Sequence, residues 1–364
     1  MTQSQVGIIS RRILTTMVLL FLVVGAAVAA PAYAVPSHAV IFMYHRFGEE
    51  RYPATNIRLN QFEAHLNHLD EGGYRVWPLK RIVTHLREGR TIPDRTVAIT
   101  IDDAFKSVYT RAYPLLKAHG FPFTVFVATN PIDQLFPSMM TWGQMREMKK
   151  GGADFANHGT SHGHLAQPDK GESRKAWRER IKGEISTAER RLEAELGSAP
   201  KLFAYPYGEY DLRLAKIVEE LGYAGFGQHS GPVGSHSDLR AAPRFPMAEA
   251  YAALRKFSMK AATLPLPVVT EEPWNPLLTG RSRPLLHLTL EKGEGDVNLR
   301  QLTCYVSGQG RGEIVWVDRD EKIFTVQATA PLGKGRSRYN CTAPSNSSGR
   351  YYWYSHPWLL TAAP

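Results

Sequence analysis

The stretch that organises this chain reads Val97-Ala98-Ile99-Thr100-Ile101-Asp102-Asp103-Ala104. Its apolar, largely β-branched run predicts a buried strand, which leads directly into two adjacent carboxylates. A buried carboxylate is stable only where a metal, a cation or several hydrogen-bond donors meet its charge. Successive strand side chains point in opposite directions, so Asp102 and Asp103 should have different roles. The pair is either part of a functional site or the cap of a following helix.

Strands and helices alternate on both sides of this stretch. Apolar runs predict further buried strands, and 3.6-residue patterns predict helices between them, so about seven βα units follow one another from residue 35 to residue 259. This alternation is typical of a parallel sheet, and the number of units favours an α/β fold closed into a distorted (β/α) barrel. Reactive side chains follow several of the strands, as a barrel with one active face predicts: His45, Asp102, Asp103, His158 and Tyr207.

The pattern changes after the barrel. Residues 260–284 are rich in Pro, Leu and Thr without periodicity, and we interpret them as a linker. Short β runs in residues 285–364 predict a small C-terminal all-β sandwich domain. Cys304 and Cys341 lie in this domain and are expected to form a disulfide if the chain is exported; the alternative is two buried free thiols. The spacing of Trp316 and Tyr339 from the two cysteines resembles immunoglobulin-like sandwiches.

The N-terminus predicts export. Arg11-Arg12 precede an apolar run over residues 13–30, and Ala32-Tyr33-Ala34 has the small-x-small pattern of a cleavage site. Residues 1–34 are therefore interpreted as a secretory signal peptide, which would leave the protein in the periplasm or outside the cell. If the segment is not cleaved, it is long enough to act as a membrane anchor.

The chain carries a net positive charge, with or without the predicted signal peptide. The formal net charge is +10, and because residues 1–34 hold two Arg and no acidic residue, it is +8 without them. Such a charge favours anionic surface polymers and a transient association with the membrane or the cell envelope. We expect no nucleic-acid partner, because the sequence has no basic stripe and no nucleic-acid-binding motif. Nothing in the sequence indicates the oligomeric state.

Two histidines suggest a metal site. His158 and His162 are four residues apart, a spacing that places both imidazoles on one face of a helical turn. Alone, such a pair is also typical of a polar surface. Combined with a strand-end carboxylate, it predicts a two-histidine, one-carboxylate site with open positions for water and substrate. His164 is left out of this set.

Three motifs together resemble a known family. Residues 100–104, 158–162 and 203–208 are similar, in order and spacing, to the first three motifs of the polysaccharide deacetylases. The resemblance extends from about residue 38 to residue 247. It implies a metal-dependent amidase that removes N-acetyl groups from amino sugars on a distorted βα barrel.

The resemblance also implies residue roles. Asp102 would be the general base, while Asp103, His158 and His162 would bind a divalent metal. Tyr207 would contribute its backbone amide to the oxyanion hole and contact the substrate. Zinc is the first expectation for the metal, and a site with two nitrogen ligands and one oxygen ligand also admits iron, cobalt or nickel.

Three departures from the family pattern need an explanation. Ala104 replaces a common Gly, which should be tolerated if its φ is negative. Ala204 replaces an Arg that pairs with the catalytic Asp in many members, and Arg244 could supply that cation from another strand. The usual Leu-x-His of the general acid is missing from the barrel, and Leu285-Leu286-His287 lies beyond the linker.

His45 can fill the missing role. Residues 42–46 resemble the N-terminal motif of the subgroup that acts on poly-β-1,6-N-acetylglucosamine, in which a histidine after the first strand supplies the proton. Without that resemblance, a strand-end histidine is more often structural. Trp142 is a further candidate, for stacking on a sugar ring, although buried aromatic packing is the alternative.

We therefore expect an exported, metal-dependent carbohydrate N-deacetylase with a polysaccharide substrate, closest to the enzymes of poly-N-acetylglucosamine. Peptidoglycan or chitin-type polymers are alternative substrates, and an O-acetyl carbohydrate esterase could use the same site. An alternative of another class is a non-catalytic carbohydrate-binding protein that has kept the barrel.

Overall fold

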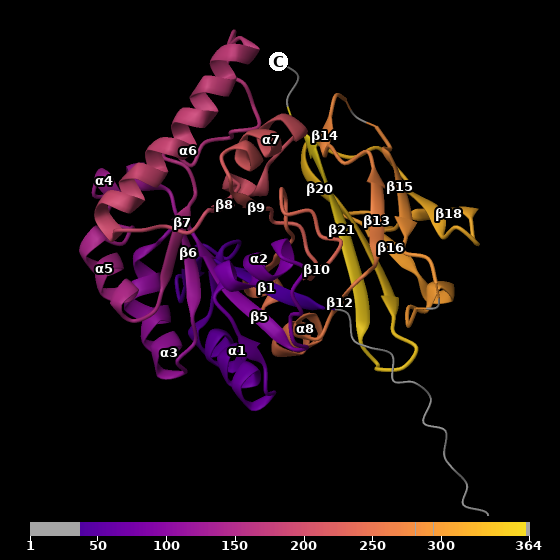
Figure 1. Ribbon diagram of the computed structural model, residues 1–364, viewed down its shortest axis with the longest axis horizontal. Coiled ribbons are helices and arrows are strands. Elements are labelled where there is room, and N and C mark those ends of the chain that lie inside the picture. Colours follow the sequence, from indigo (N-terminus) through magenta and orange to yellow (C-terminus); the bar gives the residue numbers. More distant parts are fainter. Residues whose placement is uncertain (1–36, 281, 294, 362–364) are drawn as a thin grey trace, which may run out of the picture. The chain divides into compact units, whose positions relative to one another are not determined.

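The computed structural model describes residues 37–361, except residues 281 and 294 (Figure 1). The predicted signal peptide lies outside these residues. Within the part of the chain that the structure describes, no helix is long and apolar enough to cross a membrane.

The N-terminal part is a distorted (β/α) barrel built on a curled nine-stranded sheet. Its hydrogen-bonded order is β10-β1-β5-β6-β7-β8-β9, with β11 paired to β1 and β4 paired to β5. All of these pairs are parallel except β1 with β10. The strands are β1 (His38–Tyr44), β4 (Arg75–Val76), β5 (Thr96–Asp102), β6 (Phe123–Val127), β7 (Asp154–Asn157), β8 (Leu202–Ala204), β9 (Ala224–Phe226), β10 (Val233–Gly234) and β11 (Phe245–Pro246). A separate short pair joins β2 (Arg46–Phe47) to β3 (Asn56–Ile57).

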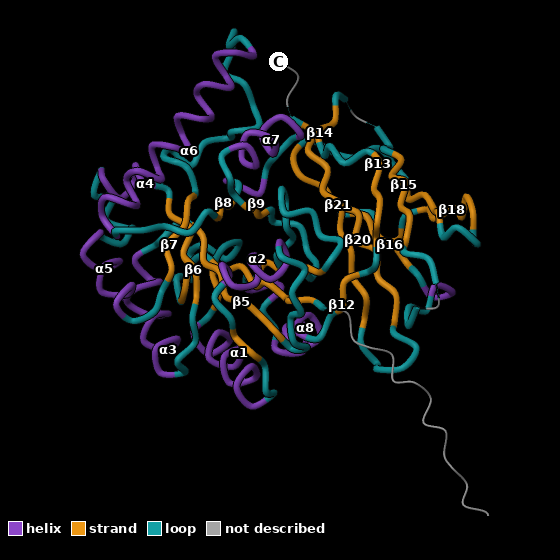
Figure 2. The backbone as a smooth tube through the Cα atoms, viewed as in Figure 1, coloured by secondary structure: helices purple, strands orange, loops and turns teal. Residues whose placement is uncertain are grey.

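Helices follow most of these strands; α1, α3, α5 and α6 lie outside the curled sheet, whereas α2 packs against its inner face (Figure 2). The longest, α6, begins where the Ser173 hydroxyl accepts a hydrogen bond from the Ala176 amide and ends at Gly197, whose φ of 77° suits glycine. The helices are α1 (Leu59–Glu71), α2 (Leu79–Arg87), a π-helical turn (Val108–Ala112) that continues into α3 (Tyr113–Ala118), α4 (Thr129–Asp133), α5 (Trp142–Lys150), α6 (Arg174–Leu196), α7 (Leu212–Glu220) and α8 (Leu254–Ala261).

Strand β5 shows why Asp102 faces the interior of the barrel. Val97, Ile99 and Ile101 pack in the core between the sheet and the surrounding helices. Ala98 belongs to a second core cluster, composed of side chains from the other face of the strands. Because side chains alternate along a strand, Asp102 lies on the same face as Ala98.

One segment connects the two ends of the curled sheet. Ala242 forms a bridge with Phe226 of β9, and β11 pairs with Phe42 and Met43 of β1. Arg244 lies between these two contacts and is fully buried. The segment that links the edges of the barrel therefore delivers a buried cation to its interior.

The C-terminal part consists of two further sheets around a core of their own. One has the order β12-β21-β20-β16-β17 with β14 on β21, and the other has the order β13-β15-β19-β18. Their strands are β12 (Leu264–Pro265), β13 (Val268–Glu272), β14 (Leu277–Leu278), β15 (Leu285–Leu290), β16 (Thr303–Val306), β17 (Gly310–Arg311), β18 (Glu313–Asp318), β19 (Ile323–Gln327), β20 (Gly335–Pro344) and β21 (Tyr351–Leu360).

Two expectations about this part need correction. The segment 260–284, expected to be a linker, carries β12, β13 and β14, because its apolar residues pair with β21 and β15. Cys304 and Cys341 do form the expected disulfide, but they are directly paired on neighbouring strands of one sheet. In immunoglobulin domains the disulfide joins the two sheets, so this part of that resemblance is wrong.

Candidate metal centre

Asp103, His158 and His162 converge at the carboxyl ends of β5 and β7. The Asp103 Oδ1 atom lies 3.4 Å from His158 Nε2 and 3.0 Å from His162 Nε2. One potential ligand atom from each residue lies within 4.8 Å of the others. The His158 side chain is almost fully buried, whereas Asp103 and His162 keep 17% and 23% of their side chains exposed. The cluster is therefore open to solvent on one side.

The loop that carries both histidines is not the helical turn expected from their spacing. Gly159 and His162 have φ angles of 78° and 56°, and the Gly159 amide donates to Asn157 Oδ1. The carboxylate of Glu184, on α6, accepts from the backbone amides of Thr160 and Ser161 at 2.9 and 3.1 Å. The loop is thus held by a charged side chain from a neighbouring helix instead of by helical hydrogen bonds.

Sequence reasoning missed Glu184. Burial raises the pKa of Glu184, but the hydrogen bonds from Thr160 and Ser161 lower it by more. The pKa of Glu184 is therefore lower than usual. One signal was present in the sequence, because Glu184 lies between Ile181 and Ala188 on the buried face of its helix.

His158 is oriented for metal binding by its second ring nitrogen. Nδ1 lies 2.7 Å from the carbonyl oxygen of Ala204, and a carbonyl can only accept, so Nδ1 carries the proton. The Nε2 lone pair is then directed at the Asp103 side. This arrangement, in which a backbone carbonyl fixes the tautomer, is typical of metal-ligating histidines.

The donor set fits a divalent transition metal. His158 Nε2 and Asp103 Oδ1 are buried and have no hydrogen-bond partner of ordinary geometry among the described residues. Buried polar atoms of this kind are costly unless a partner is supplied. Burial raises the pKa of Asp103, yet its contacts with both histidines bring that pKa well below its usual value, so it is ionised as a ligand must be. Two nitrogens and one carboxylate oxygen suit zinc, iron, cobalt or nickel.

Asp102 forms a different interaction, with Arg244. Both side chains are fully buried, and Nη1 and Nη2 of the Arg244 guanidinium donate to Oδ1 and Oδ2 of Asp102 at 2.7 and 2.8 Å. Arg244 also donates to the Gly227 carbonyl at 3.0 Å and to the Thr100 hydroxyl at 3.2 Å. Burial raises the pKa of Asp102, but the ion pair and hydrogen bonds with Arg244 outweigh it and lower the pKa. The cation absent at Ala204 is therefore supplied by Arg244.

His45 lies between β1 and β2, close enough to both aspartates for their charges to affect its pKa. Burial lowers the pKa of His45, and this effect exceeds the opposite influence of Asp103 and Asp102. The neutral imidazole is therefore favoured.

Tyr207 lies next to the histidine loop. Its ring centroid is 4.6 Å from that of His162 and 4.2 Å from that of His164, on which it stacks. Its backbone is left-handed, with φ of 59° and ψ of 3°, and its carbonyl accepts a hydrogen bond from Arg336 of β20. His164 is engaged with Glu209 through Nδ1 at 2.7 Å, outside the ligand cluster.

Trp142 is part of the protein core. Only 8% of its surface is exposed, its Nε1 donates to Asp133 at 2.8 Å, and the Arg191 guanidinium lies 5.2 Å from its ring centroid. These contacts support the packing interpretation of Trp142 rather than sugar stacking.

Strained backbone is concentrated at the site. Of the seven non-glycine residues with positive φ in the described chain, four belong to its motifs: Asp103, Ala104, His162 and Tyr207. Each such residue costs about 1–2 kcal/mol, and strain of this kind gathers at functional sites. Ala104 has a φ of 56°, so the condition of a negative φ is not met, and the Gly-to-Ala exchange is accommodated with strain.

Comparisons with known proteins agree with this geometry. Residues 89–226 match the sequence profile of the polysaccharide deacetylase family. The poly-β-1,6-N-acetyl-D-glucosamine N-deacetylase of Staphylococcus aureus strain MRSA252 is 26% identical over 208 residues, which are 56% of this chain and 71% of that enzyme. YxkH of Bacillus subtilis strain 168 is also 26% identical, over 190 residues that are 52% of this chain and 63% of YxkH.

Solved structures show the same fold. The Streptococcus pyogenes deacetylase PplD has a TM-score of 0.56 at 23% identity, covering 62% of this chain and 99% of that chain. IcaB from Ammonifex degensii has a TM-score of 0.54 at 22% identity, covering 64% of this chain and all of that chain. This chain therefore carries a polysaccharide deacetylase domain at residues 89–226.

Proposed function

We propose that this chain is an exported, metal-dependent deacetylase that hydrolyses N-acetyl groups of N-acetylglucosamine residues in a polysaccharide. The observation that carries the proposal is the pairing of a ligand cluster, Asp103 with His158 and His162, with a separate buried carboxylate, Asp102, at the same end of the barrel. Export rests on residues 1–34, and the polymer on the similarity to the Staphylococcus aureus poly-β-1,6-N-acetyl-D-glucosamine N-deacetylase.

Asp103, His158 and His162 would hold the metal. A bound divalent ion would lower the pKa of a water molecule and polarise the acetyl carbonyl. Zinc is our first expectation for this ion. Asp102 is held ionised by Arg244 and is oriented by two hydrogen bonds, so it can accept a proton from the attacking water. Asp102 would therefore act as the base, while its neighbour Asp103 would act as a metal ligand.

The remaining residues act on the substrate. The backbone amide of Tyr207 would donate to the oxyanion that develops when the acetyl carbonyl is attacked. His45 would deliver a proton to the departing nitrogen, which allows the C–N bond to break and leaves acetate and a free amine. Since burial favours the neutral form of His45, the proton that it delivers would be the one that Asp102 accepts from the attacking water, transferred from Asp102 to His45 before the C–N bond breaks.

Acetate release tests this proposal. Purified, metal-loaded chain without residues 1–34 should release acetate from β-1,6-linked N-acetylglucosamine oligomers, and Asp102→Asn should abolish release while the metal stays bound. Chitin-type oligomers, peptidoglycan and O-acetylated sugars are the comparison substrates. Acetate release only from the comparison substrates would show that one of them is the substrate class. No acetate release from any of the tested substrates would favour a non-catalytic carbohydrate-binding protein.

A further inference from the structure

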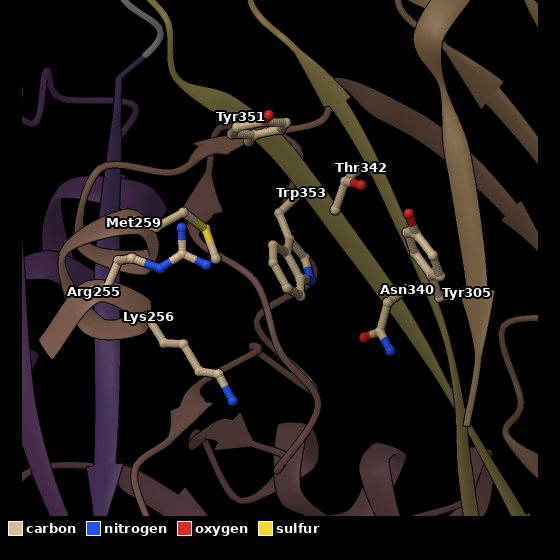
Figure 3. A pocket seen from close by; sticks show the side chains of 8 residues that line it. All are labelled: Arg255, Lys256, Met259, Tyr305, Asn340, Thr342, Tyr351 and Trp353. Carbon is tan, nitrogen blue, oxygen red and sulfur yellow. The ribbon is translucent and has the colours of Figure 1, made fainter. Parts of the chain in front are cut away.

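A pocket outside the metal centre lies between helix α8 and the six-stranded sheet of the C-terminal part. It has a volume of about 510 Å³, within the usual range for ligand sites. Figure 3 shows side chains from the helix and from the strands facing each other across it, with Trp353 between them. Its lining residues are Arg255, Lys256, Met259, Tyr305, Asn340, Thr342, Tyr351 and Trp353.

Strand alternation explains the composition of the sheet side. On β16 and β20 the directly paired Cys304 and Cys341 point into the core, so their neighbours Tyr305, Asn340 and Thr342 point outward. The register continues to β21, where Thr342 is opposite Trp353. Aromatic and small polar side chains from three adjacent strands therefore share the outer face of one sheet.

The two tyrosines are available to a ligand. Tyr305 and Tyr351 are 42% and 46% exposed, and neither side chain makes a hydrogen bond to another residue in the described part of the chain. Trp353 is fixed, because its Nε1 donates to Ser355 and its ring packs edge-on against Phe245. Two exposed rings beside a rigid indole form a platform that loses little side-chain freedom when it is covered.

The chemistry of this platform suits a sugar chain. The C–H faces of pyranose rings are apolar and can cover aromatic rings, while hydroxyl and acetamido groups require hydrogen-bond partners at the edges. Asn340, Thr342 and the tyrosine hydroxyls supply such partners. An apolar protein segment would leave these polar groups without partners, which is costly on burial.

The charge of the pocket separates substrate from product. Arg255 and Lys256 are the charged residues among its lining, and none of the eight lining residues is acidic. Acetylated glucosamine units are neutral, whereas each deacetylated unit carries an ammonium that the two cations repel. The pocket is therefore matched to sugar chains that have not yet been deacetylated.

We propose that this pocket is a second polysaccharide-binding site, outside the metal centre, which binds N-acetylated stretches of the polymer in preference to deacetylated ones. This proposal rests on the proposed function for the identity of the sugar.

The experiment uses full mature chain carrying Asp102→Asn, so that bound polymer is not consumed. Binding to immobilised poly-β-1,6-N-acetylglucosamine is compared for this protein and for versions that also carry Tyr305→Ala with Tyr351→Ala, or Tyr305→Phe with Tyr351→Phe. Val315→Ala with Val317→Ala is the matched control, because these side chains are 60% and 61% exposed on β18 of the other sheet and do not line the pocket. Thermal unfolding verifies that every variant is folded.

We expect the Ala pair to weaken binding about tenfold, since each stacked ring contributes about 0.5–1.5 kcal/mol. The Phe pair should retain most of the affinity, the control all of it, and fully deacetylated polymer should bind more weakly than acetylated polymer. If the Ala pair binds the polymer as tightly as the parent protein does, the pocket is not the binding site. If deacetylated polymer binds as tightly as acetylated polymer, the proposed preference for acetylated polymer is wrong. Tyrosine-dependent binding of single-stranded DNA tighter than that of the acetylated polymer would instead assign a polyanion.

Acetate release from a short trimer by the same tyrosine variants, with Asp102 intact, separates this proposal from the proposed function. Tyrosine-dependent binding without any acetate release would retain the pocket and refute the deacetylase. Acetate release combined with polymer binding that does not depend on the tyrosines would support the deacetylase and refute the pocket.

Discussion

The two terminal guanidinium nitrogens of Arg244, Nη1 and Nη2, lie 2.7 and 2.8 Å from the two carboxylate oxygens of Asp102, and neither residue is exposed. Arg244 is placed there by the segment that connects the two edges of the barrel. The same interaction thus orients the proposed base and compensates a charge that could not otherwise be buried.

Arg244→Met should lower the free energy of unfolding by about 3–5 kcal/mol, because it leaves the Asp102 carboxylate buried without its partner. Urea unfolding of the metal-free chain measures this. The control is Arg178→Met, because the Arg178 and Glu220 side chains of this ion pair are 40% and 48% exposed, and it should cost less than about 1 kcal/mol. Similar costs for both variants would mean that the Arg244 pair has no special role.

His45→Ala should reduce turnover of acetylated oligomers by about a hundredfold or more, since a positioned proton donor contributes at least that much. His287→Ala is the control, because His287 lies exposed on β15 of the C-terminal part and pairs across the sheet with Thr325. Steady-state rates of acetate release provide the measurement. An unchanged rate for His45→Ala would remove this residue from the mechanism.

Arg336→Ala should lower kcat about fivefold with little change in KM or in stability. Arg336 donates to the Tyr207 carbonyl and, at 3.1 Å, to Gln228 Oε1, so it positions the peptide next to the proposed oxyanion site. The effect is limited to about 1 kcal/mol by its exposure. Arg311→Ala, on β17 of the same sheet, should leave both constants unchanged. A change in KM alone would indicate a role in substrate binding instead.

Much of the site could be predicted from the sequence because its residues follow strands. His45, Asp102, Asp103, His158 and Tyr207 come directly after buried runs, and parallel strands bring those ends to one edge of the sheet. Arg244 could also be predicted, because Ala204 lacks the cation that a buried Asp102 carboxylate requires.

Other features depend on contacts that a sequence pattern does not contain. The left-handed backbone of the 158–162 loop depends on Glu184, 22 residues beyond His162. Residues 264–278 have no periodicity because their strands are short and pair with the distant β15 and β21, and a sequence without periodicity indicates a linker. The burial of Trp142 likewise depends on Asp133 and Arg191.

The stability of the metal-free chain should fall as the pH falls from about 6.5 to about 4. Burial lowers the pKa of His65 to about 4, and its ring accepts from Tyr44 and donates to the Ala252 carbonyl as a neutral imidazole. The unfolded chain, with a histidine pKa of about 6.5, binds more protons in that window, so acidification favours unfolding.

Urea unfolding at about pH 7 and about pH 5 measures this effect, which for His65 is about 1–2 kcal/mol. His65→Gln cannot titrate and should show a smaller loss between the two pH values. His229, whose pKa is lowered to about 3, will keep part of the dependence in both proteins. An identical loss in wild type and His65→Gln would show that His65 does not contribute.

A metal titration of chelator-treated chain, with acetate release measured at each step, tests whether Asp103, His158 and His162 hold the catalytic metal. Acetate release from N-acetylglucosamine oligomers should rise until one equivalent of metal per chain is bound and should not rise further. His158→Ala with His162→Ala should bind no metal at that affinity, and Asp102→Asn should bind one equivalent without releasing acetate. Acetate release by the metal-free chain, or full release by the double histidine variant, would contradict this assignment.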